Sequence, residues 1–320
     1  MASEANAIVT GKTSPEIDRL LDETADVIRR VAGDAPRPLA VVAGSGQTGL
    51  AGAVAVEHRL PAEALPHLPR PGVRGHGSGV LLGRIGPLNA IFFSGRVHLY
   101  EDWPPHAVTF AVHLASRLGA KFLFINNASG GVNPRFQPGD LMMIADQVNL
   151  TFRPLLSSGT GFPSGRDERK SLQVRSTGFS LLRSFGQTQA EACTPNLRTL
   201  YDARLGDLLR EAARLEKFLL NEGVYAANLG PAYETRSESA MLAALGADAV
   251  GMSTVAEVAA ACSVGLRVVG VSCIANMVPT WGQPQVLTHD EVIARVSGAS
   301  ERLKRLIVRW SGLVADDANR

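Results

Sequence analysis

The chain has 320 residues, with 32 Lys and Arg against 30 Asp and Glu, so its formal net charge is +2. A chain of this length buries about 75% of its unfolded surface, so it needs neither disulfides nor a structural metal to fold. Near-neutral charge without basic blocks argues against nucleic acid and anionic membranes as partners, because both bind clustered Lys and Arg. One large α/β domain and two smaller domains both fit the length.

Cysteine is rare: Cys193, Cys262 and Cys273 occur without a CxxC spacing. This usage excludes a disulfide framework and a zinc site, and it is typical of a reducing compartment. No apolar run approaches the roughly 20 residues that span a bilayer, and the first residues lack the features of a signal peptide. We therefore expect a cytoplasmic protein without a metal or a membrane partner.

Short apolar segments alternate with helical patterns along most of the chain. The first helix is predicted to begin at Pro15, with Ser14 as its N-cap, and to end before Gly33. The apolar segments are short and uncharged in their interiors, as expected for strands buried on both faces. The predicted strands are Leu39–Ala43, Ala90–Ser94, Lys121–Asn126, Leu141–Ala145, Tyr225–Leu229, Ala247–Gly251 and Arg267–Cys273.

Three later helices begin with a capping box, in which Thr and a Glu three residues on bind each other's backbone N–H groups. The pairs are Thr235 with Glu238, Thr254 with Glu257, and Thr288 with Glu291. The alternation predicts a mostly parallel sheet covered by helices on both faces, with chemistry in the loops beyond the strand ends. Residues 1–13 are expected to be a tail and 14–315 one domain, from which the aperiodic stretch 157–195 is an excursion.

The segment Leu39–Gly49 runs from an apolar strand into a glycine turn and formally matches the dinucleotide fingerprint GxGxxG. A dinucleotide site also needs a full helix and a second strand that ends in an acid. Prolines and charges follow here instead, from Glu57 to Pro71. Converging backbone N–H groups and the Ser45 hydroxyl suit one phosphate better. An ordinary strand-to-helix turn is the alternative.

The motif GRVHLYE, Gly95–Glu101, directly follows the predicted strand Ala90–Ser94. In extended backbone the side chains of Arg96, His98 and Tyr100 project to one side. A guanidinium, an imidazole and a phenol at a strand end make an oxyanion site, to which Arg offers a planar fork. A solvated edge is the alternative, although the neighbouring residues are apolar.

Other motifs follow other predicted strands. NNASGG at 126–131 predicts a turn with free backbone N–H groups, and GPAYET at 230–235 sets an aromatic side chain beside a carboxylate. Such a pair could stack on a flat base and accept its ring N–H. VGMST at 250–254 and SCIAN at 272–276 end two further strands. Taken singly, each is equally typical of ordinary loops, but together they converge on one sheet edge.

These motifs resemble, in order and spacing from about residue 14 to 312, those of the trimeric purine nucleoside phosphorylases. The most specific are GPAYET and LGADAVGMSTVAEV at 245–258, with GSG at 44–46 and GH at 75–76 completing the set. The resemblance implies a single α/β domain with a central mixed, partly barrel-like sheet flanked by helices, assembled as a homotrimer. It also implies reversible phosphorolysis of purine nucleosides to the base and ribose 1-phosphate, without a metal or organic cofactor.

The resemblance also implies roles for individual residues. Phosphate would be held by Ser45, His76, Arg96, His98, Ser253 and the backbone of Ala128, with Glu101 orienting the imidazole or touching phosphate. The ribose would meet Tyr100, Met252 and His289. The purine would meet Tyr233, Glu234 and Asn276. Catalysis would depend on Asn276, His98, Glu234 and His289, because the leaving purine gains negative charge as the glycosidic bond breaks.

A carboxylate at Glu234 facing N1 favours 6-oxopurines, so inosine, guanosine and their deoxy forms are the expected substrates. The alternatives are methylthioadenosine, xanthosine or adenosine as substrate, and a nucleoside-binding homologue without turnover. Two departures from the family pattern bear on this choice. Ala275 stands where the family usually has Thr, and 157–195 matches poorly where the family lends an aromatic residue to the neighbouring subunit. Phe179 and Phe185 are the candidates for that aromatic residue.

Overall fold

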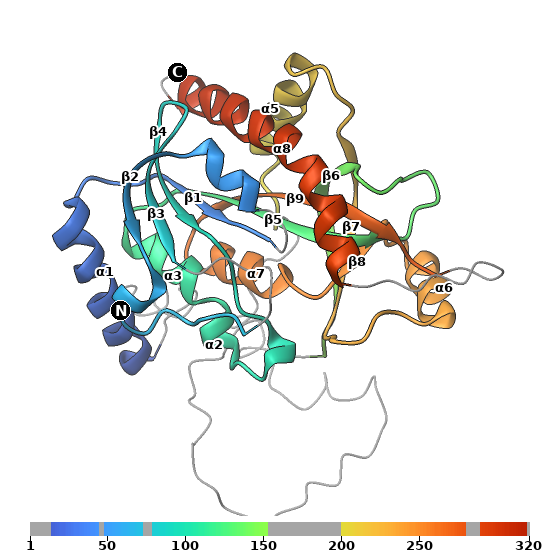
Figure 1. Ribbon diagram of the computed structural model, residues 1–320, viewed down its shortest axis with the longest axis horizontal. Helices are drawn as coiled ribbons and strands as arrows, with labels where there is room; N and C mark the ends of the chain where they lie inside the picture. Colours follow the sequence, from blue (N-terminus) through green and yellow to red (C-terminus); the bar gives the residue numbers. More distant parts are fainter. Residues whose placement is uncertain (1–13, 45–47, 73–78, 153–199, 280–288, 319–320) are drawn as a thin grey trace, which may run out of the picture.

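The computed structural model describes residues 14–44, 48–72, 79–152, 200–279 and 289–318, with 48 and 289–297 described by their backbone alone. The predicted tail 1–13, most of the last capping box and the excursion 157–195 with its two candidate phenylalanines therefore lie outside the described residues. So do Ser45, His76 and the side chain of His289. Within the described part, one mixed sheet closes partly on itself between helices (Figure 1).

The sheet has nine strands in the described residues, in the order β2-β3-β4-β1-β5-β8-β7-β6-β9, and β5 also pairs with β9. That extra pairing closes β5, β8, β7, β6 and β9 into a barrel-like unit, which confirms the fold class that the resemblance implied. The strands are β1 Leu39–Val42, β2 Ala55–Leu60, β3 Val80–Ile85, β4 Leu88–Phe93, β5 Phe122–Gly131, β6 Leu141–Leu150, β7 Asn221–Asn228, β8 Ala249–Gly251 and β9 Arg267–Met277.

The sheet is mixed, and most of its pairing is parallel, as the alternation of strands and helices predicts: β1 pairs in parallel with β4 and β5, β5 with β9, and β7 with β6 and β8. Antiparallel pairing joins β2 to β3, β3 to β4, β5 to β8 and β6 to β9. Strands β2 and β3 are not among the predicted strands, because charged residues and a glycine interrupt the apolar pattern of their sequences. β2 is an edge strand with the charged residues Glu57 and Arg59, and β3 contains Gly83 and Arg84. Gly83 is required there, since a Cβ would lie 2.1 Å from the Ala55 carbonyl oxygen of β2.

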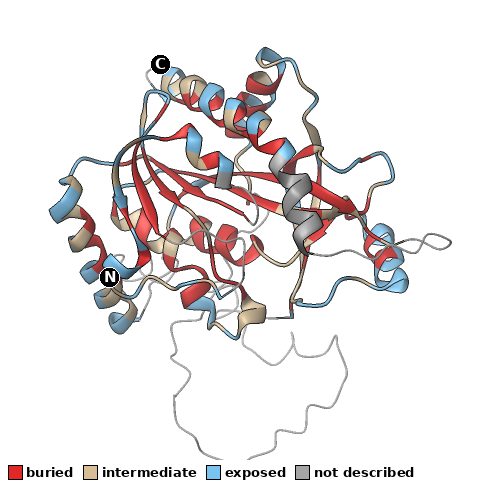
Figure 2. Cartoon of the chain, in the orientation of Figure 1, coloured by how far each residue is buried: buried red, intermediate tan, exposed pale blue. Residues whose placement is uncertain are grey.

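Helices cover both faces of the sheet, and alternate residues of β1 pack against each layer. Leu39 and Val41 join the core beneath α5 and α8, whereas Ala40 and Val42 join the core beneath α1, α3 and α7. Most strand residues are buried, except on the edge strand β2 and in the second half of β6, and exposed residues cover the outer faces of the helices (Figure 2). The helices are α1 Pro15–Ala32, α2 Pro105–Val108, α3 Phe110–Arg117, α5 Ala203–Leu215, α6 Arg236–Ala244, α7 Val255–Ser263 and α8 His289–Ala318, with 3-10 turns η1 Thr48–Ala53, η2 Ala62–Ala64 and η3 Leu99–Glu101.

The predicted helix starts in the described residues are confirmed. The Ser14 hydroxyl accepts the Ile17 N–H at the start of α1, and Thr235 and Glu238 form a complete capping box at α6. At α7 the Glu257 carboxylate accepts the Thr254 N–H at 3.0 Å. None of the helices in the described part of the chain combines the length and hydropathy that crossing a bilayer requires.

Candidate active site

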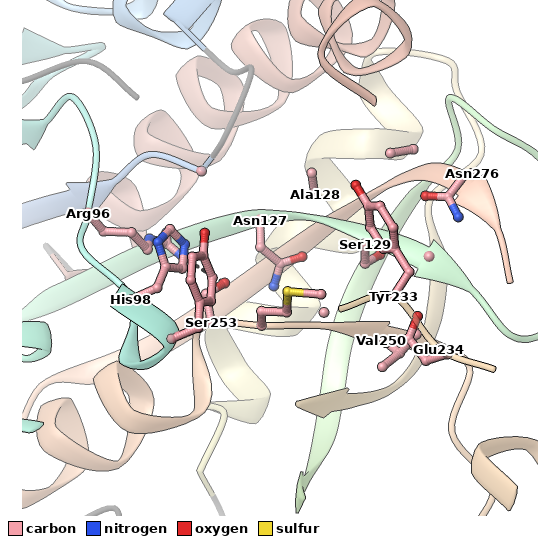
Figure 3. Close-up of a pocket in the computed structure, with 16 residues that line it drawn as sticks. Arg96, His98, Asn127, Ala128, Ser129, Tyr233, Glu234, Val250, Ser253 and Asn276 are labelled. Carbon is pink, nitrogen blue, oxygen red and sulfur yellow. Dashed lines mark hydrogen bonds between the residues drawn. The ribbon is translucent and has the colours of Figure 1, made fainter. Parts of the chain in front are cut away.

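Residues from separate segments meet in one cavity beside β5. The predicted site residues whose side chains the structure describes line it, except Glu101, which contacts His98 instead. The expected convergence of the motifs is therefore observed. Figure 3 shows Arg96, His98 and Ser253 at one end, and Tyr233, Glu234 and Asn276 at the other. The lining is Gly44, Arg96, His98, Tyr100, Asn127, Ala128, Ser129, Gly130, Tyr233, Glu234, Val250, Gly251, Met252, Ser253, Ala275 and Asn276.

The floor of the cavity is a part of β5 that no strand of the described residues covers along one edge. β1 pairs with β5 as far as Ile125, and β8 joins the same edge only at Gly130. The Asn126 carbonyl faces this open edge, where it accepts a hydrogen bond from Arg96 Nη2 at 2.6 Å. Because the backbone groups of alternate strand residues point to the same side, the Ala128 N–H faces it as well.

The predicted turn with free N–H groups at 126–131 is wrong, since these residues continue β5 and pair along β9. The SCIAN segment likewise lies inside β9, which extends to Met277. The 126–131 segment has the composition of a turn, because Asn, Ser and Gly favour turns in isolation. Pairing with β9, a strand distant in the sequence, overrides that local preference. Of the backbone groups of 126–131, those on the open edge of β5 can face a ligand.

Arg96 is the buried cation at the first end of the cavity. Its two terminal nitrogens donate hydrogen bonds, whereas Nε makes an ion-pair contact without a hydrogen bond. Nη1 donates to the hydroxyls of Ser253 and Thr254 at 3.2 and 3.3 Å, and Nη2 donates to backbone carbonyls of β1 and β5. Nε lies 3.3 Å from Oε1 of Glu257. Arg96 thus contributes a rigid positive charge and holds Ser253, rather than offering a free fork.

His98 is held in place by its neighbours in η3. Glu101 Oε1 accepts the backbone N–H of His98 at 2.9 Å and lies 3.0 Å from its Nδ1, and Glu101 Oε2 accepts the Gly72 N–H. Burial raises the pKa of the Glu101 carboxyl, but hydrogen bonds from His98 and Gly72 outweigh burial and hold the pKa below its usual value. A carboxylate at Nδ1 keeps the proton on that nitrogen, so Glu101 orients the imidazole as expected.

The predicted extended backbone through Tyr100 is wrong, because Leu99–Glu101 forms the 3-10 turn η3. Tyr100 nevertheless lines the cavity, and its ring stacks on His98 with centroids 4.7 Å apart. Burial raises the pKa of Tyr100 to about 12, so its hydroxyl stays protonated near neutral pH. The cavity wall beside His98 therefore includes a neutral phenol, and the thioether of Met252 also lines the cavity.

The other end of the cavity carries an acid and an amide. Glu234 accepts a hydrogen bond from Asn228 Nδ2 at 3.0 Å, and burial raises the pKa of its carboxyl. The Asn276 amide is 5% exposed and donates from Nδ2 to the Met277 carbonyl at 3.1 Å. This bond orients the amide without a hydroxyl at the preceding Ala275. Tyr233 is 45% exposed, which leaves a ring face available for stacking.

A glycine joins the GPAYET loop to the cavity wall. Gly230 has φ +78°, a region that L side chains rarely adopt, and a Cβ there would lie 2.4 Å from Met252 Sδ and 3.3 Å from Tyr100. The loop after β7 therefore packs directly on these two side chains, which line the cavity. Glycine is required here both by the backbone conformation and by this close contact.

Four buried polar residues beneath the cavity were missed as site residues by sequence reasoning: Asn127, Thr254, Glu257 and Ser272. The sequence patterns assign Thr254 and Glu257 to a helix cap, Asn127 to a turn and Ser272 to the end of a strand. The sequence signal for such residues is a polar side chain next to apolar strand residues. Burying polar side chains is costly unless they form hydrogen bonds with one another. Among the described residues, no group of three or more His, Cys, Asp or Glu could hold a metal ion.

Comparisons with known proteins agree with this geometry. The family model of the phosphorylase superfamily matches residues 38–310. Purine nucleoside phosphorylase 1 of Geobacillus stearothermophilus is 34% identical over 292 residues, which are 91% of this chain and 94% of that protein. Purine nucleoside phosphorylase 1 of Bacillus subtilis is 35% identical over 274 residues, 85% of this chain and 90% of that protein.

A similar fold occurs in solved structures of the Schistosoma mansoni purine nucleoside phosphorylase. Its complex with inosine has a TM-score of 0.74 and 27% identity, and the match covers 95% of this chain and 97% of that one. Its complex with adenosine has the same TM-score and identity and covers 91% and 96% of the two chains. Both likenesses extend over nearly the whole length of each protein.

Proposed function

The chain belongs to the phosphorylase superfamily and, within it, to the purine nucleoside phosphorylases, which are pentosyltransferases, and we propose that it phosphorolyses 6-oxopurine nucleosides. Inosine, guanosine and their 2′-deoxy forms would react reversibly with phosphate to give the base and ribose 1-phosphate or its deoxy form. One observation supports this most. Arg96 and Ser253 lie at one end of the cavity, and Glu234 and Asn276 lie at the other.

At the first end, the proposed ligand is phosphate. The cation of Arg96, the imidazole of His98, the hydroxyl of Ser253 and the N–H of Ala128 offer hydrogen-bond donors or positive charge to an oxyanion. Ser45 and His76, which lie outside the described residues, are proposed to complete this group. Phosphate bound there would lie beside C1′ of the ribose, stabilise the positive charge that forms on the sugar, and then capture it.

At the other end, the proposed ligand is the purine. The Asn276 amide would hydrogen-bond N7 and O6 as negative charge moves onto the leaving base, and Tyr233 would pack on its face. Tyr100 and Met252 would contact the ribose between the two ends, with His289 near the 5′ oxygen. The mechanism needs positioning and charge stabilisation, with no covalent bond to the protein.

The preference for 6-oxopurines depends on Glu234. An ionised carboxylate accepts the N1–H of hypoxanthine or guanine, but adenine has no hydrogen on N1. A site built on such a buried hydrogen bond rejects the wrong base by on the order of 10⁴. Adenosine is the second candidate substrate, because burial raises the pKa of Glu234 and a protonated carboxyl would donate to adenine N1. The solved Schistosoma mansoni relative has been crystallised with adenosine.

The oligomeric state, cellular location and cofactor requirement proposed for this enzyme are those typical of its family. We expect a cytoplasmic homotrimer that requires neither a metal nor an organic cofactor. Sedimentation analysis tests the assembly, and a particle of 33.9 kDa, the mass of one chain, would contradict it. Activity that survives dialysis against a chelator is the expected result for an enzyme that needs no metal.

The experiment for the function is base release from a panel of nucleosides. Inosine, guanosine, adenosine, xanthosine and methylthioadenosine are incubated with the protein, with and without inorganic phosphate. We expect hypoxanthine and guanine to be released fastest, only with phosphate, together with stoichiometric ribose 1-phosphate. Cleavage of methylthioadenosine alone would show that the substrate is wrong. Binding of inosine without any turnover would show a nucleoside-binding homologue instead.

A further inference from the structure

Thr254 has a backbone conformation that is unusual for its residue type. Its φ is 77° and its ψ is −51°, and the Val255 N–H closes a three-residue turn onto the Ser253 carbonyl at 2.9 Å. This γ-turn with positive φ is rare and strained, above all for a β-branched side chain. Thr254 is also 1% exposed, lies at the start of α7, and directly follows the cavity residue Ser253.

A buried chain of hydrogen bonds leads to the Thr254 hydroxyl from the other end of the cavity. Ser272 lies 2.6 Å from both the Ser129 hydroxyl and Asn127 Oδ1. A hydroxyl has one hydrogen, so if Ser272 donates to the amide it accepts from Ser129. Asn127 Nδ2 then donates to Thr254 Oγ1 at 2.9 Å. All four residues are at most 4% exposed.

The direction of this chain decides what Ser253 can do. Thr254 Oγ1 accepts from Asn127 Nδ2 and from Arg96 Nη1, so its own hydrogen is available for Ser253 Oγ, 3.1 Å away. Ser253 Oγ also accepts from Arg96 Nη1 at 3.2 Å. With both lone pairs occupied, the Ser253 hydroxyl can only donate. Among the described residues, the Tyr225 hydroxyl is an acceptor that can compete for this hydrogen, and it also accepts the Ser253 N–H at 3.4 Å.

We propose that Thr254 is a positioning residue, whose strained turn and fixed hydroxyl make Ser253 a preoriented hydrogen-bond donor to an acceptor-only oxyanion. The inference rests on the proposed function, in which that oxyanion is phosphate. The Glu257 carboxylate stabilises the turn by accepting the Thr254 N–H. The hydrogen bond that caps the start of α7 therefore also orients the Ser253 hydroxyl. Donors fixed before binding cost no reorganisation when the anion arrives.

The test compares Thr254→Val, which keeps the shape and the β-branch but loses the hydroxyl, with Thr254→Ser, which keeps the hydroxyl. Thr109→Val is the matched control, because it removes a buried hydroxyl that binds only backbone carbonyls outside the cavity. Binding of inorganic phosphate is measured by calorimetry, and KM is measured separately for phosphate and inosine.

In Thr254→Val we expect phosphate binding to weaken about tenfold, the effect of one lost hydrogen bond to a charged group, while KM for inosine changes less than about twofold. Thr254→Ser and Thr109→Val should bind phosphate within about 1.5-fold of the parent protein. Phosphate binding by Thr254→Val equal to the parent's would overturn the proposal. So would equal weakening of phosphate and inosine, which a merely structural role predicts.

A second variant covers the case in which Thr254→Val does not fold. Ser272→Ala removes the preceding link of the chain, and we expect about threefold weaker phosphate binding with inosine unaffected. Unchanged phosphate binding in that variant would overturn the proposal. Calorimetry needs no turnover, so a parent protein that binds phosphate but releases no base contradicts the proposed function while leaving the Thr254 comparison interpretable. A parent protein that binds no phosphate overturns both.

Discussion

Arg96 and Glu257 face each other 3.3 Å apart, Nε to Oε1, with side chains that are 2% and 1% exposed. The pair joins the segment after β4 to the first turn of α7 and lies at the end of the cavity that Arg96, His98 and Ser253 line. Two charges taken out of water depend on each other, because either one alone would be buried without compensation. The positive charge at the cavity wall is therefore inseparable from the stability of the fold.

Glu257→Gln should reduce the free energy of unfolding by about 3 kcal/mol, because it leaves the Arg96 cation buried without its counter-charge. Urea unfolding at one fixed protein concentration measures the loss. The control is Glu222→Gln, which removes one carboxylate from an exposed pair with Arg210 and should cost less than about 1 kcal/mol. Equal losses of unfolding free energy in the two variants would show that the buried pair stabilises the fold no more than the exposed pair does.

Asn276→Ala should lower kcat for inosine by about 10², the usual effect of removing one preorganised group that stabilises charge in the transition state. KM for phosphate should change little, because Asn276 lies at the opposite end of the cavity from Arg96. The control is Asn89→Ala, which removes an exposed amide on β4. A kcat within a few-fold of the parent's would remove Asn276 from the mechanism.

Gly230→Ala and Gly246→Ala make the same change at nearly the same backbone angle, φ +78° and +80°, but in different surroundings. A Cβ at Gly246 meets nothing within 4 Å, so only backbone strain of about 1–2 kcal/mol is expected. A Cβ at Gly230 meets Met252 Sδ at 2.4 Å, so a larger loss of stability and a raised KM for the nucleoside should follow. Steady-state kinetics and thermal unfolding measure both effects. Similar KM values for the nucleoside in the two variants would contradict the proposed effect of the contact between residue 230 and Met252.

The pH dependence of stability should reflect Glu234, because burial raises the pKa of its carboxyl above the usual value. The folded protein then holds this proton more tightly than the unfolded chain does. The resulting contribution to stability is complete below the unfolded pKa and is lost as the pH rises through the raised folded pKa. Glu234→Gln should therefore gain stability relative to the parent across that window, as followed by urea unfolding at several pH values. A constant difference between the two proteins would contradict the raised pKa.

The same titration should change the choice of base. Below the raised pKa, Glu234 carries a proton that it can donate to N1 of adenine, whereas above it the carboxylate accepts the N1–H of hypoxanthine. The ratio of kcat/KM for inosine to that for adenosine should therefore fall as the pH is lowered. Glu234→Gln, which does not titrate, should show a ratio independent of pH in this range. A ratio that falls equally in both proteins would assign the effect to another group.

Much of the strand pattern could be predicted from local sequence. The buried strands β1, β4 and β7 appear as short apolar segments. Ser14 and Thr235 are N-caps that mark the starts of α1 and α6. β2 could not be predicted in this way, because an edge strand exposes alternate residues and carries charges such as Glu57. The extension of β5 through Gly131 was also beyond local patterns, because its turn-favouring residues are held straight by β9.

The amino-acid sequence by itself determined the family, the motifs and the chemical types of side chain available at the site, because these are properties of residues and their spacing. Only the tertiary structure decided that Arg96 is tied to Glu257 and Ser253, that Thr254 occupies a strained turn, and that the gap between β1 and β8 opens one edge of β5. Each of these depends on contacts between segments far apart in the chain. The direction of each of these hydrogen bonds affects stability because they are buried, and a polar group without a partner in the protein interior costs free energy.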